Sequence, residues 1–155
     1  MVKKAEPELV AISRFKSVED ALQQVEPVRD RLHELTKRVF ESNDRNITDL
    51  SMFLLSAIAR ANGIHLATVH AIETSNPHAA IPLIRSYGDL VVTALYVRDN
   101  PNYVNALTDR RPATKVKRRS IGALITAVTR YAPGIKHVYD ELSEGTHFGS
   151  VRALT

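Results

Sequence analysis

The most constraining feature of the sequence is a regular apolar stripe near its N-terminus. Within residues 17–42, apolar side chains recur at alternating steps of three and four, at Val18, Ala21, Val25, Val28, Leu32, Leu35 and Val39. We call these seven residues the N-terminal seam. The spacing places them on one side of an α-helix and is typical of a coiled coil or an antiparallel bundle. Ser17 is a good N-cap, and Pro27, which lies off the seam, is expected to bend the helix without interrupting the stripe.

The rest of the chain also favours helices. We expect them over residues 49–73, 77–97, 120–131 and 135–145, with caps at Thr48 or Asp49 and at Asn76, and Pro77 in a first turn. A short helix is expected after Pro101, followed by a loop over residues 109–119. No stretch alternates apolar and polar residues for long enough to predict a strand.

These patterns predict one all-α domain, an antiparallel bundle of four or five main helices. A flexible arm is expected over residues 1–16, the bundle over residues 17–147 and a short tail over residues 148–155. The length of 155 residues is close to that of a single domain. The alternative adds a small hairpin at the C-terminus.

The composition limits the chemistry and the compartment. The chain has no cysteine, which excludes disulfides, thiolate metal sites and cysteine nucleophiles. Its first residues lack the apolar run of a secretory signal, and the uncharged apolar runs near residues 50–59 and 90–97 are shorter than the roughly 18–20 residues of a membrane span. We therefore expect a soluble cytoplasmic protein, with no cofactor and no bound metal.

The net charge of +4 is concentrated in one short segment. We call its six cations the basic segment, namely Arg110, Arg111, Lys115, Lys117, Arg118 and Arg119. Clustered Lys and Arg contact phosphates and give salt-sensitive binding, so these residues are candidates for binding RNA or another nucleic acid. No aromatic residues are interleaved with them for base stacking, and a solvated loop is the alternative.

An Arg-to-His spacing suggests a nuclease. Arg60 and His65 lie in one predicted helix with four residues between them. HEPN-type ribonucleases have an Arg and a His at such a spacing, where His acts as acid or base and Arg stabilises charge during attack of a 2′-OH on the phosphate. Because the chain is rich in Arg and His, chance supplies about as many matches as it contains, and an unrelated surface pair is the alternative.

The last predicted helix carries a polar stripe at helical spacing, formed by His137, Asp140, Glu141, Glu144 and His147. Glu144 and His147, three residues apart, are compatible with metal ligation. A di-iron bundle needs inward carboxylates from several helices, and the second predicted helix has no acid between Leu50 and Leu66. A solvated face is therefore the alternative to a small-molecule or metal-binding stripe.

Two charges interrupt the apolar helix predicted over residues 77–97. Arg85 and Asp89 are four residues apart, so they lie on one face of that helix. A buried charge needs a partner, and an intramolecular pair between them is expected. A polar pocket within the bundle is the alternative.

Two stretches together resemble an uncharacterised family of helical bacterial and phage proteins that is distantly HEPN-like. Residues 76–89 resemble its Asn-x-x-Ala…Arg-Ser-x-x-Glu helix, with Asp89 in place of Glu, and residues 139–147 resemble its Tyr-x-x-Leu-Ser-x-x-x-His ending. The resemblance covers about forty residues. It implies that one polar site is formed by Arg85, Asp89, Tyr139, Ser143 and His147. It supplies no reaction, and ribonuclease activity would follow only by analogy of fold.

The sequence thus favours a non-catalytic interaction or regulatory bundle that forms a homodimer through the seam of helix 17–42. The first alternative is a HEPN-like protein that binds or cleaves RNA. If the protein is an enzyme, we expect a metal-independent ribonuclease with His147, Arg85, Asp89, Tyr139 and Ser143 as candidate catalytic residues, ahead of Arg60 and His65. The second alternative is a small-molecule or metal-binding bundle.

Overall fold

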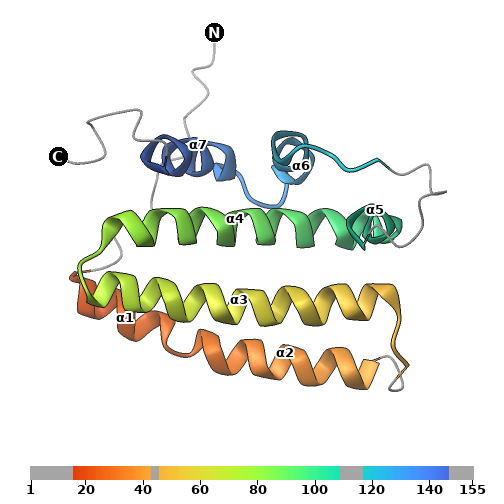
Figure 1. Ribbon diagram of the computed structural model, residues 1–155, viewed down its shortest axis with the longest axis horizontal. Helices are drawn as coiled ribbons and strands as arrows, with labels where there is room; N and C mark the ends of the chain where they lie inside the picture. Colours follow the sequence, from red (N-terminus) through yellow and green to blue (C-terminus); the bar gives the residue numbers. More distant parts are fainter. Residues whose placement is uncertain (1–15, 43–45, 109–116, 147–155) are drawn as a thin grey trace, which may run out of the picture.

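The computed structural model describes residues 16–42, 46–108 and 117–146 (Figure 1). These residues form helices and contain no strand, which confirms the all-α class. The elements are α1 (Val18–Val25), α2 (Val28–Ser42), α3 (Asp49–Glu73), α4 (Pro77–Asp99), a 3-10 turn (Pro101–Tyr103), α5 (Val104–Thr108), α6 (Ile121–Val128) and α7 (Ile135–Thr146). There are more helices than the four or five main ones expected. Residues 1–15 of the expected arm over 1–16, and the expected tail over residues 148–155, fall outside the described part.

Pro27 accounts for one of the additional helices. The N-terminal stripe was expected to form one bent helix, but α1 ends at Val25 and α2 begins at Val28. Proline has no backbone N–H, and its ring clashes with the carbonyl four residues earlier, so it interrupts a helix. The N-cap expectation is confirmed, because the Ser17 hydroxyl accepts a hydrogen bond from the Asp20 backbone N–H at 3.1 Å.

Helices α3 and α4 form the central antiparallel pair. Thr48 and Ser51 make a capping box at the start of α3, with Ser51 N–H donating to Thr48 Oγ1 at 3.1 Å and Thr48 N–H donating to Ser51 Oγ at 2.8 Å. Asn76 caps α4 through the Ala79 N–H, and Pro77 occupies the first turn as expected. The tight turn between the two helices holds Ser75 at a φ of 53°.

The three long helices α2, α3 and α4 lie side by side in one layer, as Figure 1 shows in a view down the shortest axis of the molecule. Helices α6 and α7 pack on α4 and run across it, on the side away from α3. The end of α4 is tied to the residues after α6, because Arg130 Nη2 lies 2.8 Å from Asp99 Oδ2. The Arg98 and Arg130 guanidinium groups also lie 4.0 and 4.5 Å from the Tyr131 ring centroid.

The hydrophobic core belongs to the C-terminal half of the described chain. Its buried cluster comprises Val92, Tyr96, Val97, Tyr103, Val104, Leu124, Ile125, Val128 and Tyr139. Helices α1 and α2 contain no buried residue, and only four of the 25 residues of α3 are buried. The apolar pattern of the first three helices is therefore only partly covered within the described chain.

Helices α3 and α4 are each long and apolar enough to cross a membrane. Their most apolar 18-residue windows have mean hydropathies of 1.3 and 1.2. The uncharged runs counted from the sequence are shorter than a membrane span. Both helices nevertheless remain apolar on average across the isolated charges that interrupt those runs. Length and composition do not separate a membrane span from a core helix of a soluble bundle, which passes the same test.

Candidate functional site

A polar cluster joins the middle of α4 to α7. Arg85 Nη2 donates a hydrogen bond to the Tyr139 hydroxyl at 3.2 Å, and the Arg85 guanidinium carbon lies 5.3 Å from the Tyr139 ring centroid. The Asp89 carboxylate is close enough to this hydroxyl to influence its ionisation. The structure therefore brings Arg85, Asp89 and Tyr139 together, although Tyr139 is 50 residues or more from both in the sequence.

The Tyr139 hydroxyl is held in its neutral form. Burial raises its pKa above the ordinary value, and the nearby Asp89 carboxylate raises this pKa further, while Arg85 acts in the opposite direction. Desolvation disfavours the charged form of an acid, and a neighbouring negative charge does the same. At neutral pH this hydroxyl therefore serves as a hydrogen-bonding group and not as a phenolate base.

The expected direct pair between Arg85 and Asp89 does not form. No ion pair joins these two described residues, and Tyr139 is the group that both approach. Arg85 Nε and Asp89 Oδ1 are buried and have no hydrogen-bond partner among the described residues. An unsatisfied buried polar group costs roughly 1–3 kcal/mol, so these two atoms mark the middle of α4 as a functional candidate.

Two other residues of the expected site do not extend the cluster. The Ser143 hydroxyl donates to the backbone carbonyl of Tyr139, one turn earlier in α7, at 2.7 Å. The Ser143 hydroxyl proton is therefore engaged in a hydrogen bond within α7. His147 falls in a stretch that the structure leaves undescribed.

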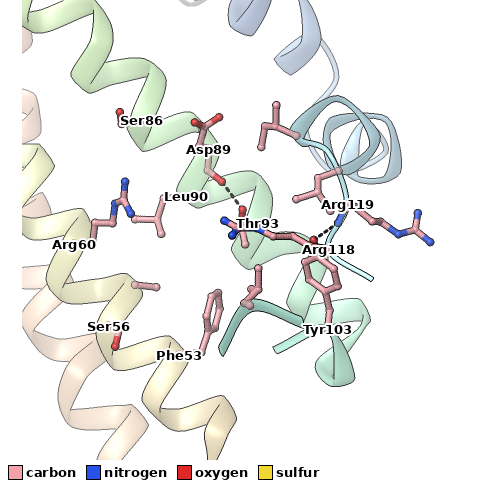
Figure 2. Close-up of a pocket in the computed structure, with 14 residues that line it drawn as sticks. Phe53, Ser56, Arg60, Ser86, Asp89, Leu90, Thr93, Tyr103, Arg118 and Arg119 are labelled. Atoms are coloured by element: carbon pink, nitrogen blue, oxygen red, sulfur yellow. Dashed lines mark hydrogen bonds between the residues drawn. The ribbon is translucent and has the colours of Figure 1, made fainter. Parts of the chain in front are cut away.

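A groove of about 570 Å³ opens beside this cluster, between α3, α4 and the start of α6 (Figure 2). We call it the arginine groove. Its cationic residues are Arg60 of α3 and Arg118 and Arg119 from the segment before α6. Figure 2 shows Arg60 on one side of the groove and Arg118 on the other, with α4 between them. Part of its lining is apolar, from Phe53, Leu90, Leu107, Ile121 and Leu124.

The arginines of the groove differ in how they are held. Arg60 and Arg118 are exposed and make no ion pair with a described acid. The Arg119 guanidinium carbon lies 5.3 Å from the Tyr96 ring centroid, and the Arg119 backbone N–H donates to the Tyr103 hydroxyl at 2.8 Å. Arg119 is thus anchored to the core, whereas Arg60 and Arg118 are available for a ligand.

The Arg60 and His65 pair is not brought together at the groove. Arg60 lines the groove, but the partly buried His65 is not among its lining residues. Five residues along a helix correspond to a rotation of about 140°, so the two side chains leave α3 in different directions.

The described residues of the polar stripe, His137, Asp140, Glu141 and Glu144, form an exposed face with local pairs. Lys136 Nζ lies 2.5 Å from Asp140 Oδ2, and His137 Nε2 lies 3.6 Å from Glu141 Oε1. No group of three or more His, Cys, Asp or Glu side chains that could hold a metal ion occurs in residues 16–42, 46–108 and 117–146.

The basic segment is described only in part. Lys117, Arg118 and Arg119 are exposed, as a nucleic-acid contact requires. The positions of Arg110, Arg111 and Lys115 lie in the undescribed residues 109–116.

Sequence reasoning missed the groove as a unit, together with its lining residues Phe53, Ser56, Ser86 and Thr93. A signal was present in the α3–α4 hairpin. Arg60 lies 13 residues before the end of α3, and Asp89 lies 12 residues after the start of α4. In an antiparallel hairpin with a short turn, residues equally far from the turn lie opposite each other. The sequence could therefore have predicted that Arg60 and Asp89 line the same region between α3 and α4.

Comparison with protein-family models, with curated proteins and with solved structures finds no match to the chain.

Proposed function

We propose that the protein is a non-catalytic interaction bundle that acts as a homodimer through the N-terminal seam. The observation that carries the proposal is the incomplete cover of this seam. Five of its seven residues are partly buried and none is fully buried, while Val18 and Leu35 are 54% and 46% exposed, and the neighbouring Phe40 is 49% exposed. Clustered apolar side chains that remain open to water favour association.

The single-layer arrangement explains why a second chain is needed. An apolar helix is normally stabilised by burial between layers. Helix α2 packs mainly on α3, and α3 has α2 and α4 beside it within the same layer. A second copy placed against α2 would supply the missing layer, and the alternating spacing of the seam suits pairing with an identical helix.

We also propose that the protein works in the cytoplasm and not within a membrane. Arg60 lies near the middle of α3, and Arg85 and Asp89 lie near the middle of α4. In a spanning orientation these charges would sit near the bilayer centre, at a cost of about 2.5–3.5 kcal/mol each.

Light scattering and sedimentation equilibrium test the dimer. We expect twice the mass of the chain at micromolar concentration, and a monomer for the Leu35→Glu variant because a charge at the seam cannot be buried cheaply. Val138→Glu is the matched control, since Val138 of α7 is 44% exposed but lies away from the seam. A wild-type protein that remains monomeric at high concentration would refute the proposal.

The second candidate function is RNA binding, with HEPN-like cleavage as its stronger form. Exposure of Lys117, Arg118 and Arg119 favours it. Gel-shift and cleavage assays with RNA pools, for the wild type, an Arg110→Gln/Arg111→Gln double variant and His147→Ala, test it. Loss of binding in the double variant supports RNA binding, and loss of cleavage in folded His147→Ala supports catalysis. Wild-type protein that neither binds nor cleaves RNA contradicts this candidate.

A further inference from the structure

We infer that the arginine groove binds a nucleoside phosphate, either free or as one unit of a nucleic-acid strand. The site lies within one chain, so it does not depend on the proposed dimer. The inference names the chemical unit that is bound and the place where it binds, neither of which is specified by the second candidate function, RNA binding. The argument rests on the charge of the groove, its apolar part and its size.

The charge of the groove favours an anion. Three arginines and one aspartate line it, so its cationic side chains outnumber its anionic ones. Asp89 approaches Tyr139, which also holds Arg85, so an internal cation lies close to this carboxylate. Arg60 and Arg118 then remain as unpaired cations on the two sides of the groove (Figure 2).

Arginine suits a phosphate better than a single point charge does. Its planar guanidinium presents parallel N–H donors that match two phosphate oxygens, and such charge-assisted bonds are about twice as strong as neutral ones. The exposed Ser56 on the α3 side is a further hydroxyl donor, with no hydrogen-bond partner among the described residues. The hydroxyls of Ser86 and Thr93 donate to backbone carbonyls of α4, at 2.8 and 2.7 Å. The phosphate donors are therefore Arg60, Arg118 and Ser56.

The apolar part of the groove favours a ligand with a flat ring. Phe53 of α3 is partly buried and lines the groove, as does Leu107 of α5. Leu90 of α4 lies between the two arginine sides. Bases stack on aromatic side chains regardless of base identity. A bare phosphate would leave this apolar surface in water, whereas a nucleoside phosphate covers it.

The volume is consistent with one such unit. The groove measures about 570 Å³, within the range of about 300–1,000 Å³ typical of small-molecule sites.

Isothermal titration calorimetry with AMP, ATP and inorganic phosphate tests the inference on the full chain. We expect AMP and ATP to bind at least tenfold more tightly than inorganic phosphate. Arg60→Gln and Arg118→Gln should each weaken binding of AMP about tenfold, which corresponds to the loss of roughly one strong hydrogen bond. Arg60→Lys should retain part of the affinity because it keeps the charge.

Arg31→Gln is the matched control. Arg31 of α2 is exposed, makes no ion pair with a described acid and is not a lining residue of the groove, and its loss changes the net charge equally. Phe53→Leu should weaken AMP binding and leave phosphate binding unchanged. Circular dichroism of each variant confirms that the helical fold is retained.

Fluorescence anisotropy with a labelled eight-nucleotide RNA and the matching DNA distinguishes the source of the ligand. Binding that is much tighter than that of AMP, with a salt dependence reduced by about 0.7 in log–log slope for each groove arginine removed, assigns the groove to a strand. No gain from the oligonucleotide assigns it to free nucleotides.

Three results of the calorimetry overturn the inference. They are an absence of heat with millimolar AMP and ATP, equal binding of phosphate and AMP, and an equal loss in Arg31→Gln. RNA binding that depends on Arg110 and Arg111 but not on Arg60 or Arg118 would overturn the inference while preserving the RNA candidate.

Discussion

The two halves of the molecule have similar apolar patterns but very different burial. The C-terminal half, with α4 packed against α3, α6 and α7, contains the buried cluster. The N-terminal half has a more regular apolar stripe, yet α1 and α2 bury none of it fully. The difference teaches that amphipathic spacing creates a face for burial, while the number of neighbouring elements decides how far that face is buried.

The largest test of this comparison is truncation of a leucine in each half. Leu124 of α6 is 4% exposed, and Leu124→Ala should lower the free energy of unfolding by about 2–5 kcal/mol through lost transfer energy and a cavity. Leu35→Ala in α2, where Leu35 is 46% exposed, should cost less than about 1 kcal/mol in the monomer. Urea denaturation at low protein concentration measures both values, and equal losses would contradict the contrast.

The Tyr139 hydroxyl provides a second, smaller test within the covered half. Tyr139→Phe leaves Arg85 Nη2 without its hydroxyl acceptor, so the free energy of unfolding should fall by roughly 1–3 kcal/mol. Tyr87→Phe is the control, because the Tyr87 hydroxyl has no hydrogen-bond partner among the described residues. If Tyr139→Phe left the free energy of unfolding unchanged, the polar cluster would contribute nothing to the docking of α7 on α4.

The smallest expected effect is an alkaline loss of stability. The pKa of Tyr139 is raised in the folded state, first by burial and then by Asp89. The folded protein therefore keeps this proton after the unfolded chain has released it. The resulting stability is fully present below about pH 10 and is lost as the pH rises through the raised pKa. Thermal unfolding against pH should show a smaller alkaline decline in Tyr139→Phe than in the wild type, and identical declines would exclude this cause.

Much of the helical framework could be predicted because its signals are local. Ser17, Thr48 and Asn76 cap helices as expected, since a cap depends on a side chain and a backbone N–H three residues away. The expected passage of one helix through Pro27 was wrong. The missing N–H at that position outweighed the continuity of the apolar stripe.

The candidate site could be predicted only in fragments. The charges of Arg85 and Asp89 stood out in an apolar helix, but their spacing indicated a direct pair and gave no sign of Tyr139 as the shared partner. The arginine groove combines α3, α4 and the segment before α6, so its residues are scattered over more than 70 positions of the sequence.

The sequence by itself determined the all-α class, most helix boundaries and the presence of isolated charges in apolar helices, because caps, prolines and periodicity act over a few residues. The tertiary structure decided which apolar faces are covered, that Arg85 and Asp89 meet at Tyr139, and that Arg60 faces Arg118 across a groove. These outcomes depend on which helices become neighbours in space, and residues far apart in the sequence decide that. The N-terminal seam thus forms a local pattern that its own chain leaves only partly buried.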